Sequence, residues 1–424
     1  MKEELLHFVW RQRLLMNKDL KSTTGAQIQI VRPGIQNFNA GPDFLAAELT
    51  IDGVLWIGNV EMHVAASDWY VHQHESDVNY DSVILHVVWE CDMEIFTKGE
   101  VLLQCLVLKG VISKKLLRNY QVFLTKHRSW IPCEKQLASV QSIYVNHWLE
   151  NLYVRRLERK ATEIQQALLG SKNDFTSVFF QFCAQAFGLK VNGFAFSQWA
   201  RQVDVKTLRK LQPNHEQLMA YLFGTAGMLR DKLEEPFYCF LQSEYKYLEH
   251  KFRLVEPKQY GFQFFRMRPA NFPTVRMAQL SAVLHAHQQL FSRVWESETL
   301  EEFYAIFQVE VHEFWDTHVS FHKTVKRQSR RLTRNFINLL VINTIIPMKF
   351  VYARFLGGDI TEQLIALLRA VPAEKNTVIA KFVDLQVQAN TAMESQGLLE
   401  LKSEFCDKKR CLYCAIGDQI LKKK

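Results

Sequence analysis

The sequence predicts an α+β protein, with an N-terminal α/β unit followed by a large all-α region. Short runs rich in apolar residues and separated by turn signals fill the first part of the chain, whereas apolar residues recur at helical spacing from about residue 113 onward. With 424 residues, 48% of them hydrophobic, the chain is long enough for one large or two ordinary domains. We expect an α/β domain over residues 1–112, a helical domain over 113–401 and a basic tail over 402–424.

The N-terminal unit is expected to begin with a helix and to continue with strands. Apolar residues at helical spacing, with acids in the first turn, predict a helix within residues 3–16. The pair Asp52-Gly53 is a strong two-residue hairpin signal between two apolar runs. The predicted strands cover residues 28–32, 44–51, 54–64 and 83–90, with further strand-like sequence over 96–109.

The rest of the chain is typical of long amphipathic helices. The most apolar run, 336–350, contains Asn338, Pro347 and Lys349 and is shorter than the ~20 residues that a membrane span needs. We therefore expect a buried core helix there and no association with a membrane. The clearest amphipathic helices are predicted over residues 143–169, 174–187, 216–228 and 277–291.

Charge is distributed unevenly along the sequence. The formal net charge is +8, yet residues 33–97 contain eleven acids and no Lys or Arg. A basic body around one acidic segment suits a protein that attracts phosphate and holds a divalent cation against it; segregation of charge by chance is the alternative. The eight cysteines do not form a disulfide framework, and no apolar signal segment opens the chain, so we expect a cytoplasmic protein.

The acidic segment contains a candidate metal site. Gly41-Pro42 fixes a turn directly before a strand, so Asp43 is expected at the mouth of that strand on rigid backbone. The hairpin then pairs Asp43 roughly with position 62, so Glu61 and His63 flank the partner position and point to the same face. A few hard oxygen ligands, with positions left for water and phosphate, are what Mg²⁺ or Mn²⁺ requires.

This pattern resembles a known nuclease signature. Pro42-Asp43, seventeen residues and then Glu61-Met62-His63 resembles the PD…(D/E)XK motif of the restriction-endonuclease-like superfamily, and the predicted order of helix, strands, hairpin, connection and strand resembles its common core. The resemblance implies that Asp43 and Glu61 hold the metal, and that Glu3 or Glu4 supplies the additional helix acid that some members use.

The sequence departs from the signature at His63, where the superfamily has a lysine. A neutral imidazole can act as a ligand or a general base, and an imidazolium stabilises a charged phosphate, but neither copies an ammonium group. Either another residue has taken the role of the lysine, or the site is not catalytic.

Further histidines follow within a few residues. His72 and His74 fall on one face if that segment is extended, and they are candidates for second metal ligands or proton carriers. The alternative is that they are ordinary polar residues satisfying backbone groups in a turn. His86, inside an apolar strand, is the weakest candidate and is expected to be a core histidine.

Two basic segments are candidates for contacts with a nucleic-acid backbone. Prolines keep the first extended, and its arginines suit bidentate phosphate contacts; the alternative is a structural connection whose arginines cap helices. The second, residues 323–334, carries six positive charges and no acid, with a solvated surface as the alternative. The candidates are Arg266, Arg268 and Arg276 in the first segment and Lys323, Lys326, Arg327, Arg330 and Arg331 in the second.

The tail contains a cysteine cluster with C-x4-C-x2-C spacing, formed by Cys406, Cys411 and Cys414. Three thiolates at this density suit a metal, and Cys133 is the candidate for a fourth ligand. One distant cysteine with a C-terminal trio resembles the iron–sulfur staple of some DNA-processing nucleases, although the spacings differ. Zinc is an equally good candidate, and metal-free reduced thiols are the structural alternative.

Over its full length the chain resembles an uncharacterised bacterial family, known only as a domain of unknown function, through six motifs. The resemblance supports the coherence of the motifs and implies no activity. The motifs are NAGPDF, GNVEMHV with SDWYVHQH, VILHVVWE, LFGTAGML, RMRPANFPTVR and CLYCAIG.

We hypothesise a metal-dependent nuclease acting on DNA or RNA, with Asp43 and Glu61 as metal ligands and His63, helped by His72 or His74, near the attacking water. One competitor is a nucleic-acid-binding protein on a degenerate nuclease fold, and another is a zinc-dependent hydrolase of a small substrate. The sequence contains no P-loop, G-x-S-x-G or H-E-x-x-H motif, so hydrolysis at a Walker site and triad chemistry are poorly supported.

Overall fold

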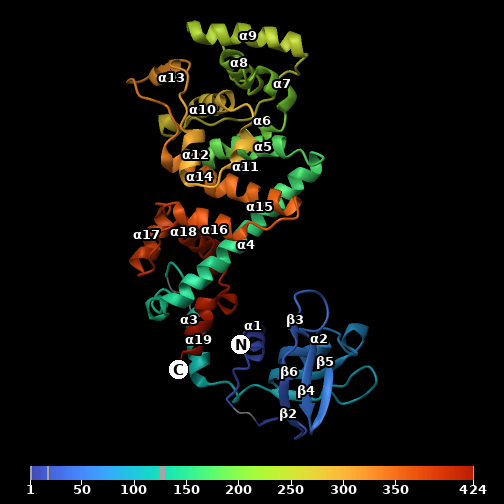
Figure 1. Cartoon of the computed structure of the whole chain (residues 1–424). Coiled ribbons are helices and arrows are strands. Elements are labelled where there is room, and N and C mark those ends of the chain that lie inside the picture. Colours follow the sequence, from blue (N-terminus) through green and yellow to red (C-terminus); the bar gives the residue numbers. More distant parts are fainter. Residues whose placement is uncertain (1, 17–18, 125–128, 424) are drawn as a thin grey trace. The chain divides into compact units, whose positions relative to one another are not determined.

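The computed structural model describes residues 2–16, 19–124 and 129–423 and has one mixed sheet near the N-terminus followed by helices (Figure 1). The mixed α/β content, with an N-terminal sheet and a helical region after it, agrees with the predicted class. Internal contacts divide the chain into two compact units. The sheet unit contains residues 1–148 together with 401–424, and the helical unit contains residues 149–400.

This division differs from the boundaries expected at residues 112 and 401. Helix α3 (Lys114–Leu124) packs on α19 (Ala415–Lys422), and Asn119 donates a 3.3 Å hydrogen bond to the carbonyl of Ile420. The C-terminal segment is therefore part of the sheet unit. Amphipathic spacing indicates that a helix packs against another element, but it does not identify that element. The sequence pattern therefore placed the end of the sheet unit too early, at residue 112.

Seven strands form the sheet, in the order β1-β2-β4-β5-β6-β7, with β3 paired to β4. Pairing is antiparallel as far as β5, and β6 and β7 are parallel to their neighbours. Asp52 and Gly53 both have positive φ, as a tight hairpin between β4 and β5 requires, so the predicted hairpin is confirmed. The strands are β1 (Leu20–Lys21), β2 (Gln27–Arg32), β3 (Ile35–Gln36), β4 (Phe44–Ile51), β5 (Val54–Ala65), β6 (Val83–Glu90) and β7 (Cys105–Val107).

A β-bulge in β4 sets the register at the far end of the hairpin. Near the turn the partners follow the hairpin, but Phe44 pairs with Val60, one residue away from the partner that the turn alone would give. Ala46, inside the bulge, has φ 52°. Asp43 therefore lies beside Glu61, and the expected pairing with position 62 is wrong by one residue, because a bulge adds a residue that no hydrophobic pattern announces.

Helix α1 (Glu3–Arg11) packs against β5. It ends earlier than residue 16 because Arg13 adopts a left-handed conformation, with φ 52°. The indole of Trp10 donates a 2.9 Å hydrogen bond to the carbonyl of Pro33, which fixes the helix beside the strand connection. Four of the five apolar positions at helical spacing are fully buried, together with Phe8, whereas the fifth, Leu14, lies beyond the helix and is half-buried. The four are Leu5, Leu6, Val9 and Trp10.

The helical unit begins within α4 (Ser142–Gly170), and the predicted helices over 143–169 and 174–187 match α4 and α5 closely. The prediction over 277–291 is displaced toward the C-terminus: α10 begins at Pro273, because proline suits the first helical position. The helices after α4 are α5 (Phe175–Phe187), α6 (Leu189–Ala200), α7 (Val205–Leu211), α8 (His215–Thr225), α9 (Pro236–Phe252), α10 (Pro273–Ala286), α11 (Leu290–Glu296), α12 (Leu300–Phe307), α13 (Phe314–Thr317), α14 (Arg334–Leu340), α15 (Ile346–Phe355), α16 (Thr361–Ala370), α17 (Thr377–Asp384) and α18 (Ala392–Glu400). A short hairpin, β8 (His318–Ser320) and β9 (Lys323–Thr324), follows α13.

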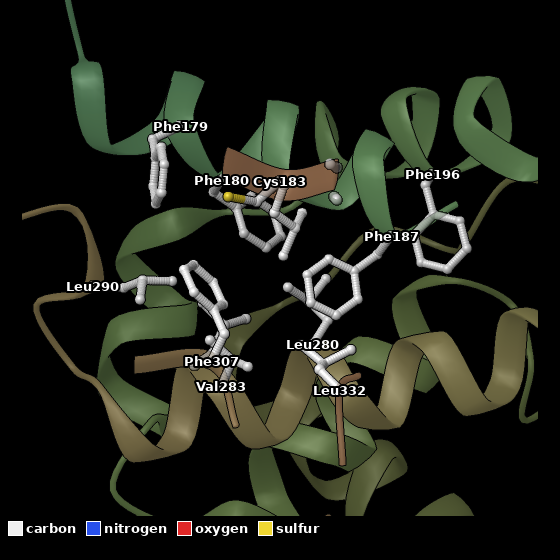
Figure 2. Close-up of a cluster of buried hydrophobic side chains, with 14 of the residues drawn as sticks. Phe179, Phe180, Cys183, Phe187, Phe196, Leu280, Val283, Leu290, Phe307 and Leu332 are labelled. Atoms are coloured by element: carbon white, nitrogen blue, oxygen red, sulfur yellow. The ribbon is translucent and has the colours of Figure 1, made fainter. Parts of the chain in front are cut away.

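One continuous apolar core holds the helical unit together. Figure 2 shows Phe180, Cys183 and Phe187 of α5 facing Leu280 and Val283 of α10, and all five side chains are buried. Burial of a large apolar side chain contributes about 1.5–3 kcal/mol. Burial of these side chains is therefore a main source of the stability of this unit.

One helix in the described part of the chain, Arg334–Phe355, is long and apolar enough to cross a membrane by length and composition. It comprises α14, a π-helical turn over Val341–Ile345 and α15, and 78% of its most apolar window is buried within the protein. This burial agrees with the core helix predicted over 336–350. Its lysine, Lys349, donates hydrogen bonds to the carbonyls of Trp295 and Ser297 at the end of α11.

Candidate metal centre

The loop before β4 holds Asp43 in a fixed conformation. Asn37 donates a 2.7 Å backbone hydrogen bond to the carbonyl of Asp43, and its side-chain amide donates to the carbonyl of Pro42 at 3.0 Å. Gly41 has φ 101°, which permits the sharp turn. The predicted rigid turn is therefore present, and Asp43 leaves it directly into the sheet.

Asp43 and Glu61 are joined by two reciprocal hydrogen bonds across the bulged hairpin. The backbone amide of Asp43 donates to Oε2 of Glu61 at 3.0 Å. The amide of Met62 donates to Oδ2 of Asp43, also at 3.0 Å. The bulge thus brings the two carboxyl groups together at the end of the hairpin.

Glu61 is 5% exposed, although it carries a carboxyl group. Burial, and after it the negative charge of Asp43, raise the pKa of Glu61 to about 9. In the absence of a cation Glu61 therefore keeps its proton at neutral pH. A cation held between the two carboxyl groups would offset both the burial and the repulsion, which makes this pair a suitable metal site.

Helix α1 adds two further side chains. His7 places Nε2 3.1 Å from Oδ2 of Asp43. Burial and then the charge of Asp43 raise the pKa of Glu3, so this carboxyl group lies within electrostatic reach of Asp43. Glu4 is exposed, and its charge, after burial, raises the pKa of Tyr120 instead. Of the two proposed helix acids, Glu3 is the one near the site, and the sequence analysis missed His7.

His63 occupies the centre of the cluster and is almost completely buried. Its Nε2 lies 3.4 Å from Oε1 of Glu61 and 3.0 Å from Nδ1 of His72. Its Nδ1 lies 2.9 Å from Nε2 of His86. Burial, followed by the neighbouring His72 and His74, lowers the pKa of His63 to about 4, so its imidazole is neutral at physiological pH.

His72 and His74 reach the site by a route that the sequence did not indicate. The segment is not extended. His72 is the C-terminal cap of α2 (Asp68–Val71), and Gln73 has φ 61°, which turns the chain back. His74 stacks on Tyr80 with ring centroids 3.7 Å apart, and its Nε2 lies 3.4 Å from Oε1 of Glu61. A helix end and a left-handed residue therefore bring His74 to Glu61 and His72 to His63.

The donor atoms of His63, His72 and His74 all lie within 4.8 Å of one another. Ligands bound about 2.0–2.2 Å from one zinc ion in a tetrahedron are separated from each other by ~3.4 Å, so the Glu61–His63 and Glu61–His74 distances suit a first coordination shell. His72 is exposed, which leaves one side of the cluster open to solvent and substrate.

Three imidazoles and a carboxyl group form a different ligand set from the oxygen ligands expected at first. Imidazole suits zinc, copper, iron and nickel, whereas magnesium prefers oxygen ligands and water. The arrangement therefore favours a transition-metal ion. Oδ2 of Asp43 is held by Met62 and His7, which leaves Oδ1 for the cation or for a water molecule.

His86 supports His63 from behind. It is fully buried, and burial with the neighbouring His63 and His74 lowers its pKa to about 3. If Nδ1 of His63 donates to His86, then Nε2 of His63 presents its lone pair toward Glu61 and His72. His86 is therefore buried as the sequence indicated, and its contact with His63 gives it a place in the site.

The two basic segments lie side by side in the helical unit. Thr274 donates a hydrogen bond to the carbonyl of Val319, and Gln279 donates to the carbonyl of Arg330. Nζ of Lys323 lies 5.7 Å above the ring of Phe272. The predicted residues that remain exposed are Arg266, Arg268, Lys323, Lys326, Arg327 and Arg331.

Arg276 and Arg330 are instead buried and serve the core. Arg276 donates to Asn271 at 2.6 Å and stacks over the ring of Phe336, and Arg330 donates to the carbonyl of Trp315 at 2.8 Å. Burial lowers the pKa of Arg276 to about 10. The two arginines therefore have a structural role and not the expected role in phosphate binding. The expectation failed because the spacing of charges in a sequence does not distinguish a buried arginine from an exposed one.

The four cysteines proposed as ligands come together in the sheet unit. Cys133, Cys406, Cys411 and Cys414 line a single small cavity. Cys133 is separated from the other three by more than 270 residues of sequence, and the structure brings it to them. The remaining cysteines are not at this cavity.

Comparisons with known proteins identify a family and no activity. No curated protein and no solved structure matches the chain. The family model described as "Protein of unknown function (DUF2851)" matches residues 3–377, which include every motif quoted above except CLYCAIG. The predicted resemblance to a family of unknown function is therefore confirmed, and the chain belongs to this family.

Proposed function

We propose that this protein is a metal-dependent hydrolase of phosphodiester bonds in nucleic acid, with its site on a restriction-endonuclease-like core. One observation carries the proposal: Glu61 is buried between the amide of Asp43 and the rings of His63 and His74. A carboxyl group is buried in such surroundings at a high cost in free energy unless a cation offsets it.

The residues divide into a metal-holding set and a positioning set. Glu61, His63, His72 and His74 supply the donor atoms closest to one another. A divalent transition-metal ion bound there would polarise a phosphoryl oxygen and lower the pKa of water. Asp43 would orient a water molecule through Oδ1.

His63 stands where the superfamily signature has a lysine. Because its imidazole is neutral and buried, it acts as a ligand and does not supply positive charge. His7, 3.1 Å from Asp43, is the nearest candidate for a cationic partner when protonated. The metal ion and His7 would supply the positive charge that the lysine supplies in the superfamily.

The exposed basic residues of the helical unit are proposed to hold the phosphate backbone. Lys326 and Arg268 have exposed side chains, and Arg327 is 77% exposed although it lies 3.7 Å from Asp316. Contacts of this kind bind all sequences alike and weaken as salt increases. We therefore propose binding without sequence preference through this surface.

The test is cleavage of single- and double-stranded DNA and RNA by the full chain with Mn²⁺, Mg²⁺, Zn²⁺ or EDTA. We expect Mn²⁺-dependent cleavage that Asp43→Asn and Glu61→Gln each reduce more than ~100-fold, because even outer-shell changes at metal sites cost ~10–100-fold. Glu94→Gln, an exposed acid in the same segment, is the matched control and should cleave normally. Normal cleavage by Asp43→Asn and Glu61→Gln would overturn the assignment.

The histidine cluster also favours a second candidate, a zinc-dependent hydrolase of a small substrate. Three imidazoles with one open side are typical of catalytic zinc sites. Zinc retained through purification, with no salt-sensitive affinity for nucleic acid, would favour this candidate. Salt-sensitive binding without any cleavage would indicate a non-catalytic binding protein on the same fold.

A further inference from the structure

A second cluster of metal-ligating side chains lies in the sheet unit, separate from the histidine site. Cys406 ends a π-helical segment (Leu401–Cys406), Cys411 lies in the 3₁₀ turn η6 (Cys411–Tyr413), and Cys414 precedes α19. Cys133 comes from the turn before the long helix α4. All four are buried, none forms a disulfide, and all face one cavity.

Apolar residues provide the rest of the cavity wall, so the lining adds no carboxylate side chain. The remaining lining residues are Ile131, Pro132, Leu137, Leu401, Phe405, Ile416 and Gly417.

The order of the cysteines in the sequence favours one of the two metals that cysteines commonly bind. Structural zinc sites usually draw their cysteines in close C-x2–4-C pairs. Here three cysteines share one C-x4-C-x2-C segment and the fourth is distant, which is the arrangement of plant-type iron–sulfur clusters, although in those the distant cysteine follows the trio.

The backbone around Cys414 provides a further feature. The backbone amides of Gly417 and Ile416, at the start of α19, donate hydrogen bonds to Cys414. A Cβ at Gly417 would clash with the carbonyl of Cys411, so glycine allows the helix start to approach the cysteine turn closely. Amide hydrogen bonds to sulfur stabilise the thiolate form and tune iron–sulfur clusters.

We propose that Cys133, Cys406, Cys411 and Cys414 bind an iron–sulfur cluster, a site separate from the proposed nuclease function and independent of it. The C-x4-C-x2-C order with one distant cysteine is a spacing that such clusters use. Each thiol releases its proton to solvent on binding iron. Inorganic sulfide and iron come from solution, with ferric iron supplying the oxidised iron atoms of the cluster, so neither the protein nor the sulfide changes oxidation state.

The cluster would fasten the C-terminal segment to the sheet. Next to its ligands, the carbonyl of Leu412 accepts a 3.0 Å hydrogen bond from Arg11 of α1, and the guanidinium of Arg11 lies over the ring of Tyr413. The hydroxyl of Tyr413 accepts from Gln36, and its ring lies 6.2 Å from that of Phe38. Arg11, Gln36 and Phe38 precede Asp43 in the sequence. The cluster would therefore stabilise the segment that leads into the loop of Asp43.

The test measures iron, zinc and acid-labile sulfide in the full chain, purified without oxygen and again after incubation with sulfide and a mixture of ferric and ferrous iron. We expect iron and sulfide in equal amounts, at two or more of each per chain, with visible charge-transfer absorption. One zinc per chain without sulfide, or no metal even after incubation, would overturn the proposal. This measurement on the wild-type chain does not depend on the folding of any variant.

Variants then test the ligand assignment. Cys133→Ser and Cys411→Ser should each lower the iron content several-fold and reduce the melting temperature, whereas Cys239→Ser, an exposed cysteine in α9, should change neither. Iron retained in full by both ligand variants would contradict the assignment. Asp43→Asn should keep its iron, so a failure of the proposed nuclease function and a failure of this site are distinguishable.

Discussion

Glu61 and His63 show how two neighbouring positions of one strand acquire different surroundings. Both side chains lie on the same face of β5, as the two-residue period of a strand requires, and their polar atoms are 3.4 Å apart. The sequence indicated this pair because the hairpin signal and the spacing from Asp43 are local. It did not indicate His7 or the contact with His86, because these come from elements whose packing no local pattern describes.

His86 offers a test of the site's second layer. His86→Leu removes the partner of Nδ1 of His63, so we expect the dissociation constant for Mn²⁺ to rise ~10–100-fold, the usual cost of losing an outer-shell partner. Titration calorimetry measures it. His86→Gln restores an acceptor and should recover part of the affinity. Equal affinities in the wild-type and His86→Leu chains would show that His63 does not depend on this contact.

At the scale of elements, the bulge in β4 decides which residues meet. Gly34 lies against the bulge with φ 86°, and a Cβ there would stand 2.7 Å from the carbonyl of Leu45. The hydrophobic pattern predicted the existence of β4 and β5, because their apolar runs and the turn between them are local features. It did not predict their register at Asp43, because a bulge is stabilised by contacts with a neighbouring connection.

Replacing two glycines separates the contact with the bulge from the cost of left-handed backbone. We expect Gly34→Ala to lower the free energy of unfolding by about 1–3 kcal/mol and to weaken Mn²⁺ binding. Gly53→Ala has a similar φ, 81°, but open space around the added methyl group, so it should cost less and leave Mn²⁺ binding unchanged. Urea denaturation and calorimetry measure both. Mn²⁺ affinity unchanged by Gly34→Ala would contradict the role of the bulge.

The second basic segment, residues 323–334, allows a further prediction at the scale of elements. Lys326→Ala and Arg327→Ala should each weaken nucleic-acid binding about equally for all sequences and reduce the slope of log affinity against log salt by about one. Lys246→Ala, an exposed lysine on α9, is the matched control. Fluorescence anisotropy over a salt series gives the slopes. Slopes unaffected by either change would place the binding surface elsewhere.

For the molecule as a whole, the sequence predicted the class of fold, several long helices and the acidic site, while the grouping of elements required the structure. Apolar runs and caps specify elements locally. The assembly of Cys133 with the C-terminal cysteines, and of residues 401–424 with the sheet unit, depends on contacts between distant segments. Composition also did not separate the buried Arg276 from its exposed neighbours.

Buried histidines make the helical unit sensitive to acid. Burial, followed by His285 and His312, lowers the pKa of His215 to about 4 from 6.5. A depressed folded-state pKa means that its contribution to stability is present above pH 6.5 and is lost as pH falls from 6.5 toward 4. We expect the melting temperature to fall by several degrees over that range. His215→Phe, which retains a ring against His285, should fall less.

The control for this measurement is His250→Gln, an exposed histidine at the end of α9, which should follow the wild-type curve. Calorimetric melting between pH 7.5 and pH 4.5 provides the comparison. An unchanged pH dependence in His215→Phe would assign the acid sensitivity to other groups, such as His86 in the sheet unit.

The most direct test of the central claim is calorimetric titration of the metal-free chain with Zn²⁺ and, separately, with Mn²⁺. Binding at the cluster of Glu61, His63, His72 and His74 predicts a single site that Glu61→Gln and His63→Asn each abolish, while Glu94→Gln binds as the wild type does. The absence of binding of both ions, or binding that survives unchanged in both Glu61→Gln and His63→Asn, would contradict the existence of this metal centre.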